Sequence, residues 1–231
     1  SFYDYYFKKN LIRTNPPRQV DVPKIKNKNI IRLDPNEIAQ LLDEAESGEK
    51  LSGRQLASHE KTKVRDVAIL TLLLGTGIRV SECVGLNLED VDFNNGAIRI
   101  IRKGGNEALI YFGDEVSQAL EAYMNGPRKK DEPAAGHEEA LFISLNKTRI
   151  TTRSVERLVK KYSRLVTTVK KITPHKLRST FGTALYQETG DIYLVADTLG
   201  HKDVNTTKKH YAAIDEHRRR MVANVVKLRE S

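Results

Sequence analysis

The stretch that decides the fold runs from Val64 to Glu82 and reads VRDVAILTLLLGTGIRVSE. Its first part is rich in leucine, which predicts a deeply buried helix ending near residue 74. Gly75 and Gly77 follow, and they predict the end of that helix and a tight turn, because glycine accepts the backbone conformation that ends many helices. The turn leads directly to Arg79. The stretch therefore predicts a buried central helix that presents an arginine at its end.

A mainly helical chain is predicted around this stretch. Upstream, Asp34 is expected to cap a helix that begins at Pro35, with Glu37 completing a capping box and Gly48 ending the helix. A loop with two prolines is expected over residues 126–136. Further helices are predicted over residues 114–124, 152–167, 174–189, 192–199, 206–211 and 215–229.

Strands are predicted only between residues 94 and 112. Asn94-Asn95-Gly96 is typical of a hairpin turn, and the alternating Ile98 and Ile100 predict a strand. Lys103-Gly104-Gly105-Asn106 predicts a second turn, after which residues 109–112 return. This pattern predicts a small antiparallel sheet of two or three strands. The expected fold class is therefore mainly α with a small antiparallel β-sheet.

The positive charge of the chain is concentrated in one segment. The 231 residues include 39 Lys and Arg and 30 Asp and Glu, which gives a net charge of +9 and favours a polyanionic partner. From Lys147 to Arg178, eleven basic residues stand against one acid, whereas residues 34–60 hold two basic residues and seven acids. This asymmetry argues against a uniformly solvated surface and points to one polyanion-binding face.

The first 30 residues are expected to form an arm and linker, because the sequence NPPR at 15–18 breaks any helix. Seven basic residues against two acids through Lys28 suit an extended segment lying on a polyanion, and a plain linker is equally compatible. Cys83 is the only cysteine, so no intrachain disulfide can form. No apolar run reaches membrane-spanning length and the start does not resemble a signal peptide. We therefore expect a cytoplasmic protein with no membrane partner.

Six residues far apart in the sequence carry side chains that suit the grip and attack of a phosphodiester. Guanidinium groups donate paired hydrogen bonds to phosphate oxygens, and fixed cations there lower the barrier to attack. A tyrosine has a pKa of about 10, so a nucleophilic one needs cations or a base nearby. Each residue alone is more often structural, but their local contexts together reverse that interpretation. The six are Arg79, Lys103, His175, Arg178, His201 and Tyr211.

The sequence disfavours chemistry that depends on a metal or cofactor. It has no His-x-x-x-His zinc pattern, no cysteine pair and no cluster of acids suited to magnesium. It also lacks a P-loop and a dinucleotide-binding fingerprint. We therefore expect no cofactor and no metal.

In their order and contexts, the six residues resemble the tyrosine recombinases, the phage integrase and Xer family, over about residues 34–220. The family string His-x-Leu-Arg-His-Thr-Phe-Ala-Thr stands at 175–183 as HKLRSTFGT, with Ser179 and Gly182 as departures. A second departure is the spacing from the Leu-Gly-His histidine, His201, to Tyr211, which is ten residues where the family has nine. The loop before Tyr211 must therefore bulge, or its helix must shift by one residue.

The resemblance also implies roles for individual residues. It implies that His175 assists proton transfer and that His201 donates a hydrogen bond to the scissile phosphate. Lys103 would protonate the leaving 5′-hydroxyl, and its neighbour Arg102 is the residue most easily confused with it. Glu82 resembles the family's supporting acid beside the active site, where its alternative role is a simple ion pair.

Taken over the whole chain, the resemblance implies a site-specific recombinase or integrase. Tyr211 would attack double-stranded DNA to give a 3′-phosphotyrosyl link, without metal or ATP, within a synaptic tetramer of protomers. Residues 1–30 would be the end of a core-binding region and a basic linker, 31–214 the catalytic domain, and 215–231 a helix suited to exchange between protomers. Packing of that helix on its own domain is an equal alternative.

Two other functions fit the same residues, namely DNA relaxation by a type IB topoisomerase and DNA binding by a catalytically silent protein of this fold. Because all six positions are filled, the silent protein is the weaker alternative. In each case the basic segment is expected to follow the phosphate backbone. The residues expected to contact DNA are Lys147, Arg149, Arg153, Arg157, Lys160, Lys161, Arg164, Lys170, Lys171 and Lys176.

Overall fold

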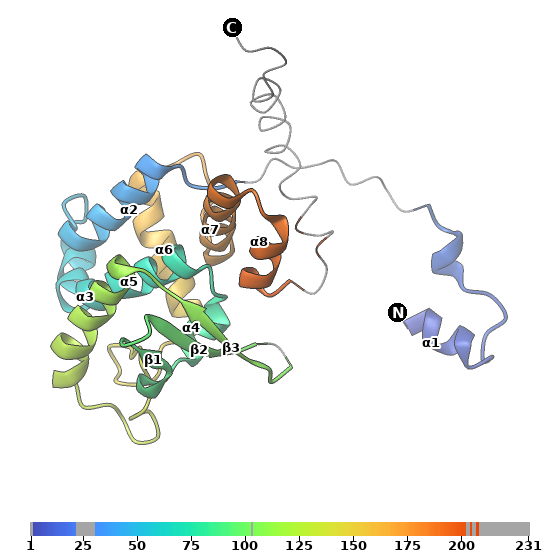
Figure 1. Ribbon diagram of the computed structural model, residues 1–231, viewed down its shortest axis with the longest axis horizontal. Helices are drawn as coiled ribbons and strands as arrows, with labels where there is room; N and C mark the ends of the chain where they lie inside the picture. The colour runs from blue at the N-terminus through green and yellow to red at the C-terminus, as the bar shows by residue number, and fades with distance from the viewer. Residues whose placement is uncertain (1, 22–30, 103, 202–203, 205–206, 208–231) are drawn as a thin grey trace, which may run out of the picture.

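The computed structural model describes residues 2–21, 31–102 and 104–201, together with residues 204 and 207 (Figure 1). Lys103, Tyr211 and the helix predicted over residues 215–229 lie outside the described residues, as does most of the helix predicted over 206–211. The elements in chain order are α1 Phe2–Lys8, η1 Pro16–Gln19, α2 Pro35–Ser47, α3 Gly53–Thr76, α4 Val80–Gly85, η2 Leu88–Asp90, β1 Val91–Asp92, β2 Ala97–Ile101, β3 Glu107–Tyr111, α5 Asp114–Tyr123, η3 Met124–Arg128, α6 Thr152–Val166, α7 Pro174–Thr189 and α8 Ile192–Leu199.

The long helix α3 forms the centre of the domain, as its leucine-rich sequence predicts. It contacts α2, α5, α6 and α7, which surround it in Figure 1. Its residues Ile69, Leu70 and Leu72 are completely buried. The helix begins at Gly53, well before the predicted start at Val64, because a polar first part continues the same helix. That part lacks the apolar pattern from which the sequence predicted a helix.

Helix α2 confirms the predicted capping chemistry. The Asp34 side chain accepts a hydrogen bond from the Glu37 backbone nitrogen at 2.9 Å, and the Glu37 side chain accepts one from the Asp34 nitrogen at 2.9 Å. At the other end Gly48 takes a left-handed conformation with φ of 68°. The hydrogen bond from the Glu37 backbone nitrogen to its carboxylate is the main cause that holds the pKa of Asp34 below its ordinary value.

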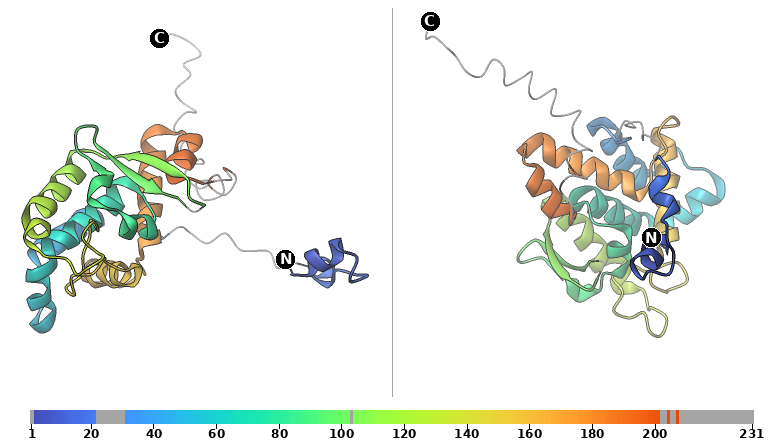
Figure 2. Two further views of the ribbon diagram at one scale, coloured as in Figure 1. Left: turned by 90° about the horizontal axis from the view of Figure 1, so that it is seen from below. Right: turned by 90° about the vertical axis from the view of Figure 1, so that its right-hand side faces the viewer.

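The sheet has three antiparallel strands in the order β1-β2-β3, which confirms the predicted fold class. Ile98 faces Ile110 across β2 and β3, and both are buried against the domain. The opposite face of the sheet exposes Leu109 and Tyr111. The turn between β2 and β3 lies beyond the domain core, on the side of α8 (Figure 2).

Two segments differ from prediction. The loop predicted over 126–136 begins later, because η3 carries the helix past Gly126 with a kink there. Arg128 ties this turn down, since its buried side chain donates to the Ala140 carbonyl at 2.9 Å. The predicted arm is also partly helical, because α1 and η1 form within residues 2–21. By contrast, α7 and α8 match their predicted bounds.

Candidate active site

Arg79 is held at the junction between α3 and α4. Gly77 ends α3 with φ of 63°, and Arg79 then caps α4. The buried Glu82 fixes Arg79 twice, accepting from its backbone nitrogen at 2.6 Å and from its guanidinium at 2.8 Å. The other side-chain nitrogen donates to the Gly200 carbonyl at 3.2 Å. Because the Arg79 side chain is still 36% exposed, it remains accessible to a ligand.

Arg178, on α7, joins the ends of two other helices. Its side chain is buried and donates to the Gly77 carbonyl at 2.5 Å and to the Leu199 carbonyl. Gly77 has the left-handed conformation that favours glycine. It is also required because a methyl group on it would collide with the Phe181 ring of α7. The close approach of α3 and α7 therefore sets Arg178 beside the turn that carries Arg79.

A third arginine reaches the same place from the sheet. The Arg102 guanidinium donates to the Asp197 carbonyl at 3.4 Å from each terminal nitrogen and to the Thr198 carbonyl at 3.2 Å. Arg79, Arg102 and Arg178, from three separate parts of the fold, thus meet on four consecutive carbonyls at the C-terminal end of α8. We call these three residues the arginine cluster. The carbonyl end of a helix carries partial negative charge, which favours cations there.

Of the two predicted histidines, His201 follows the Gly200 carbonyl that Arg79 bonds, and His175 lies on α7 with Arg178. His201 follows α8 directly, and its backbone nitrogen donates to the Ala196 carbonyl at 2.8 Å. Its Nδ1 forms a 2.7 Å hydrogen bond with the hydroxyl of Thr207, which is completely buried. His175 is exposed in the first turn of α7, three residues before Arg178.

The structure brings together Arg79, Arg178 and His201, and places His175 on the same helix as Arg178. Thr207 and Arg102 have contacts here that the sequence did not predict. A threonine among polar residues gives no signal of burial, whereas the position of Arg102 next to Lys103 was a signal available in the sequence.

The predicted DNA-contact residues fall into two groups. Some are bonded within the chain, such as Lys161 with Asp66 at 3.4 Å and Arg149 with the Leu86 carbonyl at 2.7 Å. Lys147 pairs with Asp131, and Lys170 pairs with Glu37. The remaining six have no such side-chain bond to another described residue and lie exposed or half-buried on the surface: Arg153, Arg157, Lys160, Arg164, Lys171 and Lys176.

Four of these six form one basic face on α6. Arg153, Arg157, Lys160 and Arg164 are spaced by three or four residues and are all exposed, so they share one side of the helix. The buried residues of α6, including Tyr162, lie at other positions and pack inward.

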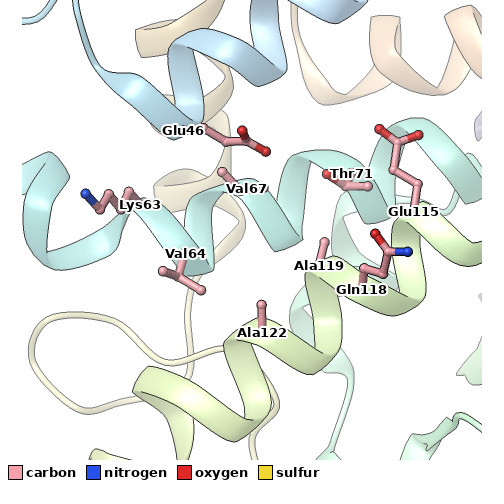
Figure 3. Close-up of a pocket in the computed structure, with 9 residues that line it drawn as sticks. All are labelled: Glu46, Lys63, Val64, Val67, Thr71, Glu115, Gln118, Ala119 and Ala122. Atoms are coloured by element: carbon pink, nitrogen blue, oxygen red, sulfur yellow. The ribbon is translucent and has the colours of Figure 1, made fainter.

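Elsewhere in the described part of the chain, the structure shows no second site comparable to the arginine cluster. A groove of about 370 Å³ lies between α2, α3 and α5, and Figure 3 shows its lining of Val64, Val67 and Ala119 with Glu46 and Glu115 nearby. It includes none of the arginine cluster. Within the described residues no group of three or more His, Cys, Asp or Glu is arranged to hold a metal, and no helix there is long and apolar enough to cross a membrane.

Comparison with known proteins gives tyrosine recombinases as relatives. The chain is 35% identical over 210 residues to a tyrosine recombinase XerC from Thermodesulfovibrio yellowstonii, covering 90% of this chain and 66% of the relative. It is 30% identical over 208 residues to a tyrosine recombinase XerD from Oceanobacillus iheyensis, again with 90% and 66% coverage. The chain thus spans just under two thirds of the length of these relatives.

Solved structures with the same fold include a recombinase and a transposon integrase. The XerA recombinase superposes with a TM-score of 0.70 at 25% identity, over 97% of this chain and 73% of that one. The integrase of the Tn1549 transposon, in complex with transposon right end DNA, superposes with a TM-score of 0.68 at 25% identity, over 97% and 76% of the two chains. A model of the phage integrase family matches residues 31–218. The chain therefore belongs to the phage integrase family.

Proposed function

We propose that this chain is the catalytic part of a site-specific DNA recombinase, which cleaves and rejoins DNA through a 3′-phosphotyrosyl intermediate. The observation that carries the proposal is the meeting of Arg79 and Arg178 on adjacent carbonyls, directly before His201. Two guanidinium groups fixed side by side can bind both non-bridging oxygens of one phosphodiester. Those oxygens gain charge during attack, so prearranged cations stabilise the transition state.

In the proposed reaction the Tyr211 oxygen attacks the phosphorus and the bond from phosphorus to the 5′-oxygen breaks. Lys103 supplies the proton that the leaving 5′-oxygen takes up. The 5′-hydroxyl of a partner strand then attacks the phosphotyrosyl bond and releases Tyr211. Because that bond conserves the energy of the phosphodiester, the cycle needs neither ATP nor metal.

His201 is set up to donate a hydrogen bond to the phosphate. When the Thr207 hydroxyl donates to Nδ1, the proton of the neutral ring resides on Nε2. The Nε2–H group is then a donor that suits a phosphate oxygen. His175, exposed one turn before Arg178, is the residue we assign to proton transfer with Tyr211.

The wider assembly is also part of the proposal. Residues 31–214 form the catalytic domain, residues 1–30 the end of a core-binding region and a basic linker, and the exposed basic face of α6 lies along double-stranded DNA. The named relatives are recombinases, which supports strand exchange within a synaptic tetramer over simple DNA relaxation or silent binding. We place the protein in the cytoplasm, with which the single free thiol of Cys83 is compatible.

The decisive test is Tyr211→Phe in a cleavage assay on a DNA substrate nicked near the cleavage site. The substitution removes only the nucleophilic hydroxyl, so we expect no covalent protein–DNA adduct on a denaturing gel, with DNA binding nearly unchanged. Wild-type protein is the positive control. An adduct that persists in Tyr211→Phe would remove Tyr211 from the reaction and direct attention to other tyrosines.

The segment after Glu216 tests the synaptic part of the proposal separately. It carries an apolar series of Met221, Val222, Val225, Val226 and Leu228, which we propose docks on a neighbouring protomer. Deleting the residues after Glu216 should impair full recombination far more than DNA binding by one protomer, as compared in recombination and gel-shift assays. If strand exchange survives the deletion, the segment only packs locally.

A further inference from the structure

Arg102 is fixed at both its backbone and its side chain. Its backbone nitrogen donates to the Asn106 carbonyl at 2.8 Å, and its carbonyl accepts from the Gly105 nitrogen at 3.0 Å, so the residue forms the base of the turn between β2 and β3. Its guanidinium spans from there to the Asp197 and Thr198 carbonyls of α8. Arg102 therefore ties the sheet to the end of α8, two elements that are distant in sequence but meet at the site (Figures 1 and 2).

Gly200 shows how close this contact is. A methyl group on Gly200 would lie 2.6 Å from the Arg102 Cζ and 2.9 Å from its Nε, so no larger residue fits without displacing Arg102. Gly200 also has φ of 61°, which disfavours other residues for a separate reason. The same residue offers its carbonyl to Arg79 and precedes His201 directly. Arg102 thus packs on the one residue that links two members of the proposed active site.

We propose that Arg102 is a positioning residue, which holds the C-terminal end of α8 and thereby sets His201 and the Gly200 carbonyl that orients Arg79. The Asp197 carbonyl already accepts from the Gly200 nitrogen at 2.8 Å, whereas the last carbonyls of a helix, such as that of Thr198, have no partner inside it, and α8 has only eight residues. A guanidinium that bonds two of these carbonyls and sits at the negative end of the helix restrains the last turn. The inference rests on the proposed function, because its effect is read through DNA cleavage.

The first experiment measures single-turnover cleavage of nicked DNA by Arg102→Ala and Arg102→Lys. We expect Arg102→Ala to slow cleavage on the order of 10²-fold, as small misplacement of reacting groups does, and Arg102→Lys to recover part of the rate. The matched control is Arg99→Ala on β2, the strand that leads to Arg102; the Arg99 side chain is 43% exposed and pairs with Asp90 at 2.9 Å. It should cleave at the wild-type rate.

Salt titration of DNA binding separates positioning from direct contact. Removing a positioning residue leaves the salt dependence unchanged, whereas removing a residue that neutralises a phosphate lowers the slope by about 0.9. A lowered slope for Arg102→Ala would overturn the inference. Thermal melting of each variant identifies the temperature range in which the variants are folded, and rates are compared there.

A double-mutant cycle then tests whether Arg102 acts through His201. If it does, Arg102→Ala slows cleavage less in the His201→Ala background than in the wild type, because part of its effect passes through His201 and the rest through Arg79. Two losses that multiply in full would show independent action and contradict the proposal. Gly200→Ala should likewise be less harmful in the Arg102→Ala background, where the collision is gone. If wild-type and Arg99→Ala proteins form no covalent adduct, the proposed function fails. If they do and Arg102→Ala matches them, only the role of Arg102 fails.

Discussion

The arginine cluster and the polar network between α3 and α6 pair their cations in different ways. In the network, the buried Asp66 carboxylate lies at the centre and accepts from Arg65 at 2.7 Å, Tyr162 at 3.1 Å and Lys161 at 3.4 Å. Tyr162 in turn bonds the buried His59 ring at 3.0 Å. In the arginine cluster the acceptors include backbone carbonyls of α8, which are dipoles without net charge.

This difference distinguishes a network that stabilises the fold, around Asp66, from a cluster that can bind an anion. The Asp66 carboxylate supplies counter-charge to Arg65 and Lys161 inside the protein. In the arginine cluster Glu82 pairs with Arg79, but the carbonyl dipoles that also orient the guanidinium groups carry no net charge, and an incoming phosphate can supply further counter-charge. The Asp66 network also acts on a tyrosine. Burial, together with the charge of Asp66, raises the pKa of Tyr162, which keeps that phenol protonated and unsuited to attack.

The largest effect is expected on folding stability, when the network between α3 and α6 loses the charge of Asp66. Asp66→Ala leaves Arg65 and Lys161 without their carboxylate and should lower the free energy of unfolding by about 3–5 kcal/mol, measured by urea denaturation. Asp66→Asn keeps an acceptor for Tyr162 and should lose less. Cleavage by the folded fraction should stay near the wild-type rate. A stable Asp66→Ala protein with slow cleavage would place the network inside the active site and break the comparison.

A smaller effect, measured in the chemical step, is expected at Arg178. Arg178→Ala should raise the cleavage barrier by about 3 kcal/mol, comparable to the loss of one donor to a transition-state oxyanion. Arg178→Lys should recover little, because an ammonium group cannot form the paired contact of a guanidinium. Single-turnover cleavage, at a temperature where melting shows both variants folded, measures the effect. Near wild-type cleavage by Arg178→Lys would contradict the phosphate clamp.

The smallest effect per residue is expected on DNA binding, at the exposed basic residues of α6. Alanine at Arg157 or Lys160 should weaken DNA binding and lower its salt slope by about 0.9 for each phosphate that the protein no longer neutralises. Lys161→Ala, on the same helix, should change the slope less, because Asp66 already holds that ammonium group. Equal slopes for all three variants would show that exposure on α6 does not separate DNA contacts from internal ion pairs.

Local chemistry explains which parts of the fold were predictable. The capping box at Asp34, the glycine stops at Gly48 and Gly77, and the bounds of α7 each depend on a few neighbouring residues, and all are confirmed. Predictions were wrong where distant contacts override local pattern. Arg128 anchors a helical turn past Gly126 by bonding a carbonyl twelve residues away, which no local signal indicates.

The sequence by itself determined the family and the class of fold, and it supplied the side chains that we propose for the chemistry, because these depend on residue type and local spacing. The tertiary structure alone decided which basic residues are already bonded, such as Lys161 and Arg149, and which remain exposed. It also decided that Arg102, a neighbour of a predicted catalytic lysine, reaches the end of α8. The physical reason is that a guanidinium takes its role from the acceptors around it. For Arg102 and Arg178 the acceptors include carbonyls about a hundred residues away in the sequence. These come within reach only when α3 packs on α7 and the sheet reaches α8.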